Sequence, residues 1–155
     1  MSAPRLNRVV ADFSASATRN NTIRLKDLRG QNVVIYFYPK DSTPGCTSEG
    51  QDFRDLHAKF RRQGAIVLGV SRDSIASHEK FRVKQKFPFD LISDPDEALC
   101  RKFDVIQEKT LYGRKFMGIE RSTFLIDAAG KLRNEWRKVK VKGHAAEVLE
   151  AGKGL

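Results

Sequence analysis

The chain contains several short apolar runs of the kind that form buried β-strands. Residues 32–38 (NVVIYFY) and 65–71 (AIVLGVS) are rich in β-branched and aromatic side chains without polar alternation. This pattern is typical of strands that are covered on both faces. The remaining strand candidates are 22–29, as a short strand or turn, 89–92, and a hairpin made of 121–127 and 132–139. Residues 108–118 are expected to be a loop.

Between these strands, apolar residues recur at helical spacing. Phe53, Leu56 and Phe60 lie on one face of a helix that is expected to run from Cys46 to Gly64. Three further helices are expected. One covers about 75–86, a short one follows the start signal Asp94-Pro95-Asp96-Glu97, and the last covers about 143–151. The alternation of strands and helices predicts one α/β domain over residues 1–155, with a mixed, partly parallel β-sheet and helices on both faces.

Composition limits the classes of function. A chain of 155 residues with 40% hydrophobic residues is long enough for one domain with its own core. The net charge of +10 allows a basic nucleic-acid-binding module, but the cationic residues are spread along the chain without an aromatic stacking stripe. The longest apolar run, 33–38, is too short to span a bilayer, so we expect a cytoplasmic protein that binds neither a membrane nor a specific nucleic acid.

The cysteine count excludes further classes. The chain has only Cys46 and Cys100, which are too few for a disulfide scaffold or a four-thiolate zinc site. A dithiol reductase is also excluded, because no C-x-x-C motif is present. His57, His78 and His144 are isolated in the sequence, so we interpret them as surface or helix-side residues and expect no metal site.

Cys46 stands where chemistry is expected. It follows a buried strand and a turn, and it falls in the first turn of the predicted helix, where free N–H groups and the helix dipole favour thiolate over thiol. Thr43, three residues earlier, can direct its hydroxyl to the same place. Pro39 and Pro44 are stiff and can hold the pocket in shape. The alternative is an inert, buried cysteine.

These residues carry a resemblance. The pattern Pro39-x-x-x-Thr43-x-x-Cys46 resembles the active-site motif of the peroxiredoxins. The run 36–56 is similar to the peroxiredoxin Q group, also called bacterioferritin comigratory proteins, and the similarity continues through 67–74, 91–105 and 120–131. The resemblance implies a thioredoxin-like fold and a thiol peroxidase activity that needs no metal, haem or flavin cofactor.

The resemblance also implies roles for individual residues. Cys46 would attack hydrogen peroxide or an organic hydroperoxide and become a sulfenic acid. Thr43, Arg121 and the backbone N–H of Cys46 would stabilise the charge that develops, and Glu49, one helical turn after Cys46, could orient Arg121. The alternatives are a solvated charge at a strand end for Arg121 and compensation of the helix dipole for Glu49.

The sequence departs from the group at the resolving cysteine. The two positions where members usually carry it hold Gln51 and Arg82. We therefore expect a one-cysteine cycle that uses an external thiol reductant such as thioredoxin, glutaredoxin or glutathione, in a monomer, with a dimer as the alternative. Cys100 lies among apolar helical neighbours and is interpreted as a core thiol. Its alternative role is that of an atypical resolving cysteine.

Overall fold

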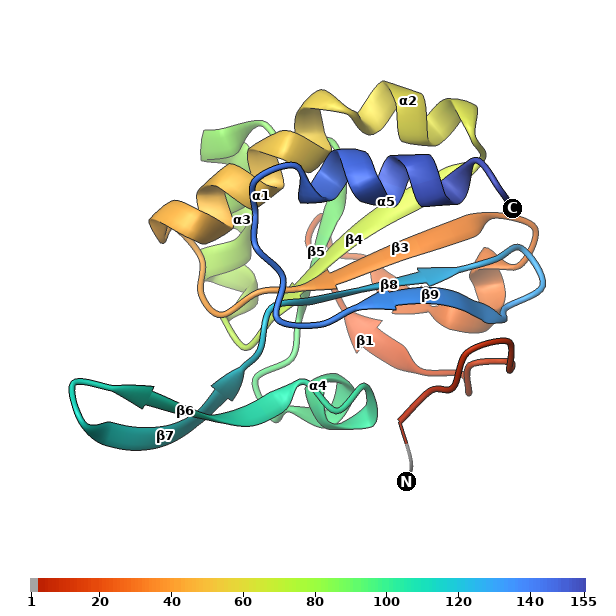
Figure 1. Cartoon of the computed structure of the whole chain (residues 1–155). Helices are drawn as coiled ribbons and strands as arrows, with labels where there is room; N and C mark the ends of the chain where they lie inside the picture. The colour runs from red at the N-terminus through yellow and green to blue at the C-terminus, as the bar shows by residue number, and fades with distance from the viewer. Residues whose placement is uncertain (1–2) are drawn as a thin grey trace.

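A five-stranded mixed sheet forms the centre of the protein, whose structure, a computed structural model, describes residues 3–155. The strand order is β5-β4-β3-β8-β9 (Figure 1). The parallel strands are β3 (Asn32–Phe37), β4 (Ala65–Ser71) and β5 (Asp90–Ser93). Two antiparallel strands, β8 (Ser122–Ile126) and β9 (Leu132–Trp136), extend the sheet beyond β3. The predicted strands at 32–38, 65–71 and 89–92 and the predicted hairpin are thereby confirmed.

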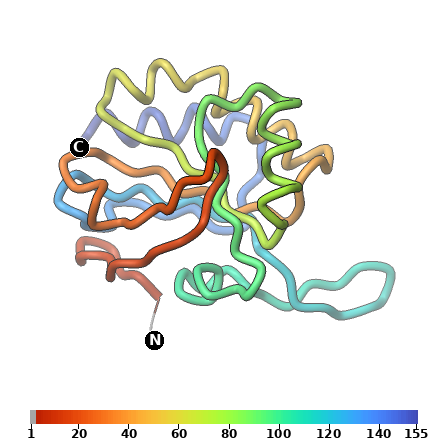
Figure 2. Tube along the Cα trace, turned by 180° about the vertical axis from the view of Figure 1, so that it is seen from behind, coloured from red at the N-terminus to blue at the C-terminus, as the bar shows by residue number. Residues whose placement is uncertain are grey.

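Helices cover both faces of this sheet, as predicted, but unequally. One face carries α1 (Pro44–Asp55), α2 (His57–Arg62), α3 (Ile75–Gln85) and α5 (His144–Gly152). The other face carries α4 (Ala98–Lys102), the hairpin of β1 (Ser14–Ser16) and β2 (Thr22–Arg24), and a 3-10 helix (Leu25–Leu28). Figure 2 shows the same two layers from behind. The α/β, thioredoxin-like fold is therefore confirmed.

The apolar run in β3 supplies both cores. Side chains of a strand alternate between its faces, so Val34 and Tyr36 pack under α1, whereas Val33, Ile35 and Phe37 pack against the α4 side. All five side chains are buried. A central strand covered on both faces needs no polar alternation, which explains the continuous apolar pattern of residues 32–38.

The long helix predicted from Cys46 to Gly64 is interrupted. Helix α1 ends at Asp55, α2 begins at His57, and Leu56 between them leaves the helical conformation with φ −96° and ψ 1°. The break changes the axis without changing the inward face, because Phe53 and Phe60 are both buried in the same core. Periodicity alone therefore identified the buried face correctly and missed the bend.

The loop predicted over 108–118 is wrong. These residues form most of an antiparallel hairpin, β6 (Ile106–Leu111) and β7 (Arg114–Ile119). Tyr112 and Gly113 connect the strands with φ of 52° and 78°, the two positive values of a tight hairpin turn. The hairpin projects from the body and its outer residues are exposed on both faces, so its sequence lacks the alternation of a half-buried strand.

No helix within residues 3–155 combines the length and the apolar character that crossing a bilayer requires.

Gly50 fixes how closely α1 packs, which gives a test of the fold. A Cβ atom at this buried position would overlap the ring of Phe87. Replacing glycine by alanine inside a helix normally stabilises it by about 1 kcal/mol. We expect Gly50→Ala instead to lower the free energy of unfolding by about 1–3 kcal/mol, because the ring or the helix must move. Chemical denaturation measures the change, with the exposed Ser48→Ala in the same helix as the control. A stabilised Gly50→Ala variant would contradict this packing.

Candidate functional site

The predicted nucleophile lies at the edge of the sheet where the parallel strands end. The segment 38–43 leaves the end of β3 and leads into α1. Thr43 is the extended residue before the helix and Pro44 is its first residue, so Cys46 lies in the first turn. The N–H groups of that turn have no acceptor within the helix, and the dipole is positive there. Cys46 is only 2% exposed, so its sulfur is screened from bulk water.

Arg121 reaches this turn from the neighbouring strand. It immediately precedes β8, and the antiparallel register pairs Ser122 with Phe37 at the end of β3. Its Nη2 lies 3.4 Å from Cys46 Sγ. Gly45 makes room for this approach, because a Cβ atom there would lie 3.1 Å from the same nitrogen. The guanidinium can therefore stabilise negative charge on the sulfur.

Glu49 holds the other half of the guanidinium. Its Oε1 accepts a hydrogen bond of 2.6 Å from Arg121 Nη1. The carboxyl is 1% exposed, and this burial raises its pKa to about 7, although the charge of Arg121 and its hydrogen bond act in the opposite direction. Within the described residues, its second oxygen has no hydrogen-bond partner. The structure thus brings Cys46, Arg121 and Glu49 into direct contact.

Thr43 and Pro39 lie on the same segment without such contacts. The Thr43 hydroxyl donates to the backbone oxygen of Lys40 at 2.8 Å instead of pointing its proton at the sulfur. Its oxygen keeps lone pairs with which it can accept a hydrogen bond. Pro39 is half-buried directly after Tyr38. The sequence analysis expected Thr43 to stabilise the charge that develops during the reaction, and this role stays a prediction.

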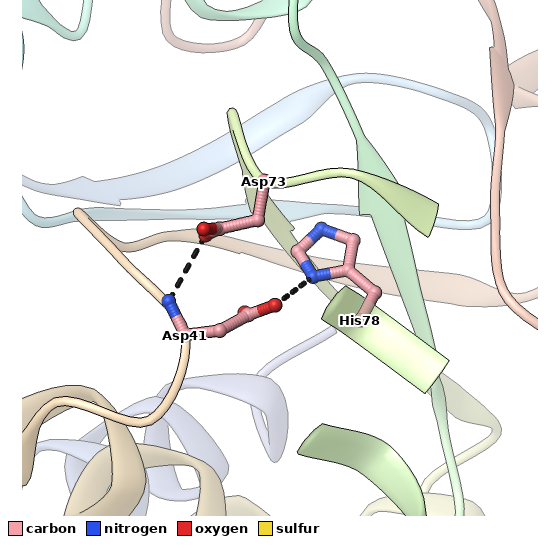
Figure 3. A group of neighbouring side chains, drawn as sticks. All are labelled: Asp41, Asp73 and His78. Carbon is pink, nitrogen blue, oxygen red and sulfur yellow. Dashed lines mark hydrogen bonds and ion pairs between the residues drawn. The ribbon is translucent and has the colours of Figure 1, made fainter. Parts of the chain in front are cut away.

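A buried network that the sequence did not reveal anchors this segment at Asp41 (Figure 3). The Asp41 carboxylate accepts hydrogen bonds from the hydroxyls of Tyr38 (2.7 Å) and Ser77 (2.8 Å). It also lies 2.7 Å from Nδ1 of His78, whose Nε2 lies 2.9 Å from the carbonyl oxygen of Ile92. Both ring nitrogens of His78 therefore lie at hydrogen-bond distance from an oxygen. Asp41 lies between Pro39 and Thr43, so α3 holds the segment that leads to Cys46.

Asp73 completes the network. Its Oδ2 accepts hydrogen bonds from the backbone N–H of Asp41 (2.9 Å) and the Ser71 hydroxyl (2.5 Å). Potential ligand atoms of Asp41, Asp73 and His78 lie within 4.8 Å of one another, the closest approach to a metal site among the described residues. Those atoms already bond to each other and to neighbouring donors and acceptors. We therefore interpret the cluster as an anchor for the segment rather than as a set of free ligands.

Two of the three histidines are not surface residues. His78 is fully buried in α3, and His144 is buried at the start of α5, where its Nε2 lies 2.7 Å from the Thr123 hydroxyl. Burial lowers the pKa of His144 to about 4. His57 is half-buried in α2. All three lie in helices, as the helix-side alternative expected, but the surface alternative is wrong for His78 and His144. Their hydrogen-bond partners lie 37 and 21 residues away in the sequence, where no local spacing can indicate them.

Cys100 lies on the other side of the sheet. It belongs to the core on the α4 face, whereas Cys46 belongs to the core under α1. Its side chain is fully buried, and burial together with Asp94 raises the pKa of its thiol. The Asp94 carboxylate accepts hydrogen bonds from the N–H groups of Leu99 and Cys100, at 3.0 and 2.7 Å. It thereby caps α4, although the helix begins only at Ala98.

Shape alone does not mark the site. An open groove lined in part by Phe13, Arg72, Pro95 and Lys102 does not include Cys46. What distinguishes the region around Cys46 is its chemistry, because a screened thiol, a guanidinium and a buried carboxyl converge at the start of a helix.

The raised pKa of Glu49 predicts a specific dependence of stability on pH. The carboxyl has its ordinary value of 4.5 when unfolded and about 7 when folded, so the native state binds the proton more tightly. The contribution of Glu49 to the free energy of unfolding should therefore fall as pH rises from about 4.5 to about 7, by an amount on the order of 2–3 kcal/mol. The lowered pKa of His144 acts in the opposite direction over this range and is common to both proteins, so denaturation should show the wild type losing stability relative to Glu49→Gln as pH rises. Parallel curves for the two proteins would contradict the shift.

Comparison with known proteins agrees with this geometry. Residues 6–135 match the model of the AhpC/TSA family. The chain is 56% identical over 140 residues to the peroxiredoxin Bcp of Xanthomonas campestris, covering 90% of this chain and 88% of that protein. It is 49% identical over 144 residues to the peroxiredoxin Bcp of Bacillus subtilis, covering 93% and 92%.

Solved structures are similar as well. Peroxiredoxin Q of Xanthomonas campestris superposes with a TM-score of 0.88 at 55% identity, over 92% of this chain and 90% of that one. A serine mutant of PrxQ from Xylella fastidiosa superposes with a TM-score of 0.93 at 44% identity, over 99% and 98%. The sequence, the sheet and the surroundings of Cys46 agree with these matches, and the chain belongs to the AhpC/TSA family, in the Bcp or peroxiredoxin Q group of peroxiredoxins.

Proposed function

We propose that this peroxiredoxin reduces hydroperoxides by a one-cysteine cycle in which Cys46 becomes a sulfenic acid and an external thiol restores it. The observation that carries the proposal is the position of Arg121 Nη2, 3.4 Å from a nearly inaccessible Cys46 Sγ at a helix N-terminus. A guanidinium and free N–H groups there can stabilise the negative charge of a thiolate, the nucleophilic form of cysteine.

The first half of the cycle is a two-electron oxidation of sulfur. The Cys46 thiolate attacks one peroxide oxygen along the O–O axis, the S–O bond forms, and the O–O bond breaks. The leaving oxygen takes a proton and departs as water or an alcohol, and the sulfur becomes a sulfenic acid. Arg121 and the N–H of Cys46 can donate to the oxygens as charge moves onto them. The Thr43 hydroxyl, whose proton is directed to Lys40, can accept the peroxide O–H.

The substrate class follows from the same contacts. Every donor and acceptor named above addresses the two peroxide oxygens, so hydrogen peroxide and organic hydroperoxides can use the same site. Structures of the Xanthomonas campestris bacterioferritin comigratory protein are described as giving insight into its alkyl peroxide reduction activity. We propose the same substrate class for this chain.

The second half of the cycle needs a thiol from outside the chain. Solved structures of Xanthomonas campestris peroxiredoxin Q include serine mutants of two different cysteines. The spacing between those two cysteines equals the spacing between Cys46 and Arg82 in this chain. Arg82 is half-buried in α3 and pairs with Glu79 at 3.0 Å. Cys100 packs on the opposite face of the sheet from Cys46, which favours its role as a core thiol.

Cysteine variants test the cycle. We expect Cys46→Ser to abolish peroxide reduction and Cys100→Ser to retain the single-turnover rate, because only Cys46 contacts Arg121. Competition kinetics with hydrogen peroxide and with an alkyl hydroperoxide measure the rate, and mass spectrometry detects the sulfenic acid as one added oxygen. Turnover with thioredoxin, glutaredoxin and glutathione identifies the reductant. Thiol-dependent turnover that is lost in Cys100→Ser would instead assign Cys100 the resolving role.

A second prediction concerns the anchor at Asp41. Asp41→Asn weakens the hydrogen bond with His78 Nδ1, so we expect the rate with peroxide to fall by about tenfold or more through misplacement of the segment that leads to Cys46. Competition kinetics measure the rate well below the melting temperature. The rate of Cys46 alkylation by iodoacetamide, which needs no bound peroxide, should change less.

The matched control is Asp90→Asn. Asp90 is as buried as Asp41, at 7% exposure, and also accepts three side-chain hydrogen bonds, from Thr18, Arg19 and Asn21. It begins β5, an edge strand of the sheet that is separated from β3 by β4. Both variants should lose stability, but only Asp41→Asn should also react more slowly with peroxide. Equal loss of rate in both would show that Asp41 acts on stability alone.

A further inference from the structure

The hairpin of β6 and β7 is the part of the molecule that neither the core nor the catalytic contacts explain. It forms its own two-stranded sheet and projects from the body on the side of the segment between β3 and α1 (Figures 1 and 2). Ile106 and Ile119, paired at its base, are buried, whereas Tyr112 at its tip is 95% exposed. β7 ends at Ile119, two residues before Arg121, so the base of the hairpin is attached to the catalytic centre.

The register of the hairpin separates its side chains into two faces. Residues directly opposite each other share a face, as do residues two apart. We call the face that carries Lys109, Leu111, Arg114 and Phe116 the site-side face. The opposite face carries Glu108, Thr110, Lys115 and Met117.

The site-side face is the one next to Cys46. Ile106 and Ile119, at the base of the hairpin, share the opposite face and pack into the core on the α4 side of the sheet. Cys46 packs into the other core, which lies under α1. Lys109 is half-buried, and its pKa is lowered by this burial and by the charge of Arg121, while the charge of Cys46 acts in the opposite direction. A molecule lying on the site-side face would therefore be adjacent to the reactive sulfur.

The two faces differ in charge. The site-side face offers two cations, Lys109 and Arg114, beside the exposed Leu111 and Phe116, and it has no acidic side chain. On the opposite face, Lys115 is compensated by Glu108, 3.7 Å away. A complementary partner for the site-side face is acidic and has an apolar patch. A surface of this small size fits a transient redox encounter rather than a permanent complex.

We propose that the site-side face is the docking surface for the protein that reduces Cys46, and that this protein is a small acidic dithiol protein of the thioredoxin type. The inference rests on the one-cysteine cycle proposed above. Cys46 is nearly inaccessible, and the chain places no second thiol beside it in this structure, so a reductant has to be held at the site. Docking raises the effective concentration of its thiols.

The electrons and atoms of the docked reaction balance. One thiolate of the partner attacks the Cys46 sulfenic acid, an S–S bond forms, and the hydroxyl takes a proton and leaves as water. The second thiol of the partner then attacks the partner's first sulfur, the one bonded to Cys46, and displaces Cys46 as a thiolate. The partner ends as a disulfide, having supplied the two electrons that the peroxide removed.

Neighbouring residues on opposite faces provide matched variants. Arg114→Glu and Lys115→Glu reverse the same charge on the two faces, and Leu111→Ser and Met117→Ser remove side chains that are both 56% exposed. The probe is an acidic bacterial thioredoxin, kept reduced by its reductase, with peroxide at saturation. We expect Arg114→Glu and Leu111→Ser to raise the KM for thioredoxin about tenfold, the equivalent of ~1.4 kcal/mol, and the variants of the opposite face to change it less than about twofold.

Two further readouts separate docking from a general defect. Turnover with dithiothreitol, which needs no docking surface, should be the same in all four variants and the wild type. The KM for thioredoxin should rise with salt in the wild type and less steeply in Arg114→Glu, because salt screens exposed charges.

Other results would overturn the inference. Equal effects on the two faces, or none, would remove the docking role, and so would a wild type that turns over with dithiothreitol but not with thioredoxin. That last result would leave the peroxidase cycle intact, whereas failure with both reductants would contradict the proposed function itself. A wild-type dimer that Leu111→Ser converts to a monomer, seen by sedimentation, would assign the face to self-association.

Discussion

The site depends on one shared guanidinium. Arg121 donates to the Glu49 carboxyl through one nitrogen and to Cys46 Sγ through another, so its orientation is set by a carboxyl that water hardly reaches. A planar fork of donors suits this task, because it can bond two acceptors at a fixed angle. The arrangement also explains why Glu49 is buried despite the cost. Glu49 holds the guanidinium of Arg121 against the sulfur, and Gly45 leaves the space through which the guanidinium reaches the sulfur.

The same site needs a fixed backbone on its other side. The segment between β3 and α1 has few apolar side chains to pack, yet it carries Pro39, Thr43 and the entry to the helix of Cys46. Asp41 compensates for this lack of packing by accepting three side-chain hydrogen bonds, two of them from α3. A buried carboxylate tolerates burial only with such partners. The network therefore couples the position of α3 to the position of the catalytic segment.

The sequence was sufficient for the parts of the structure that local patterns determine. Continuous apolar runs identified the parallel strands, and the position of Cys46 after a strand and a turn placed it at a helix start. The hairpin at 106–119 was not predicted, because strands that are exposed on both faces show no alternation of apolar and polar residues. His78 escaped because its partner Asp41 is distant in sequence. The contact of Arg121 with Glu49 and Cys46 came from family resemblance, since spacing alone does not bring a strand end and a helix together.

The two halves of the proposed cycle place opposite demands on the protein. Attack on a peroxide favours a sulfur that is screened from water and surrounded by fixed donors, because such donors need no reorganisation as charge develops. Reduction by another protein favours access and a surface that attracts the partner from a distance. A rigid body containing Cys46 and an exposed, cationic hairpin attached beside Arg121 divide these tasks between separate elements. On this view the net charge of +10 acts through its position as well as its size, because the site-side face carries cations that no acid on that face compensates.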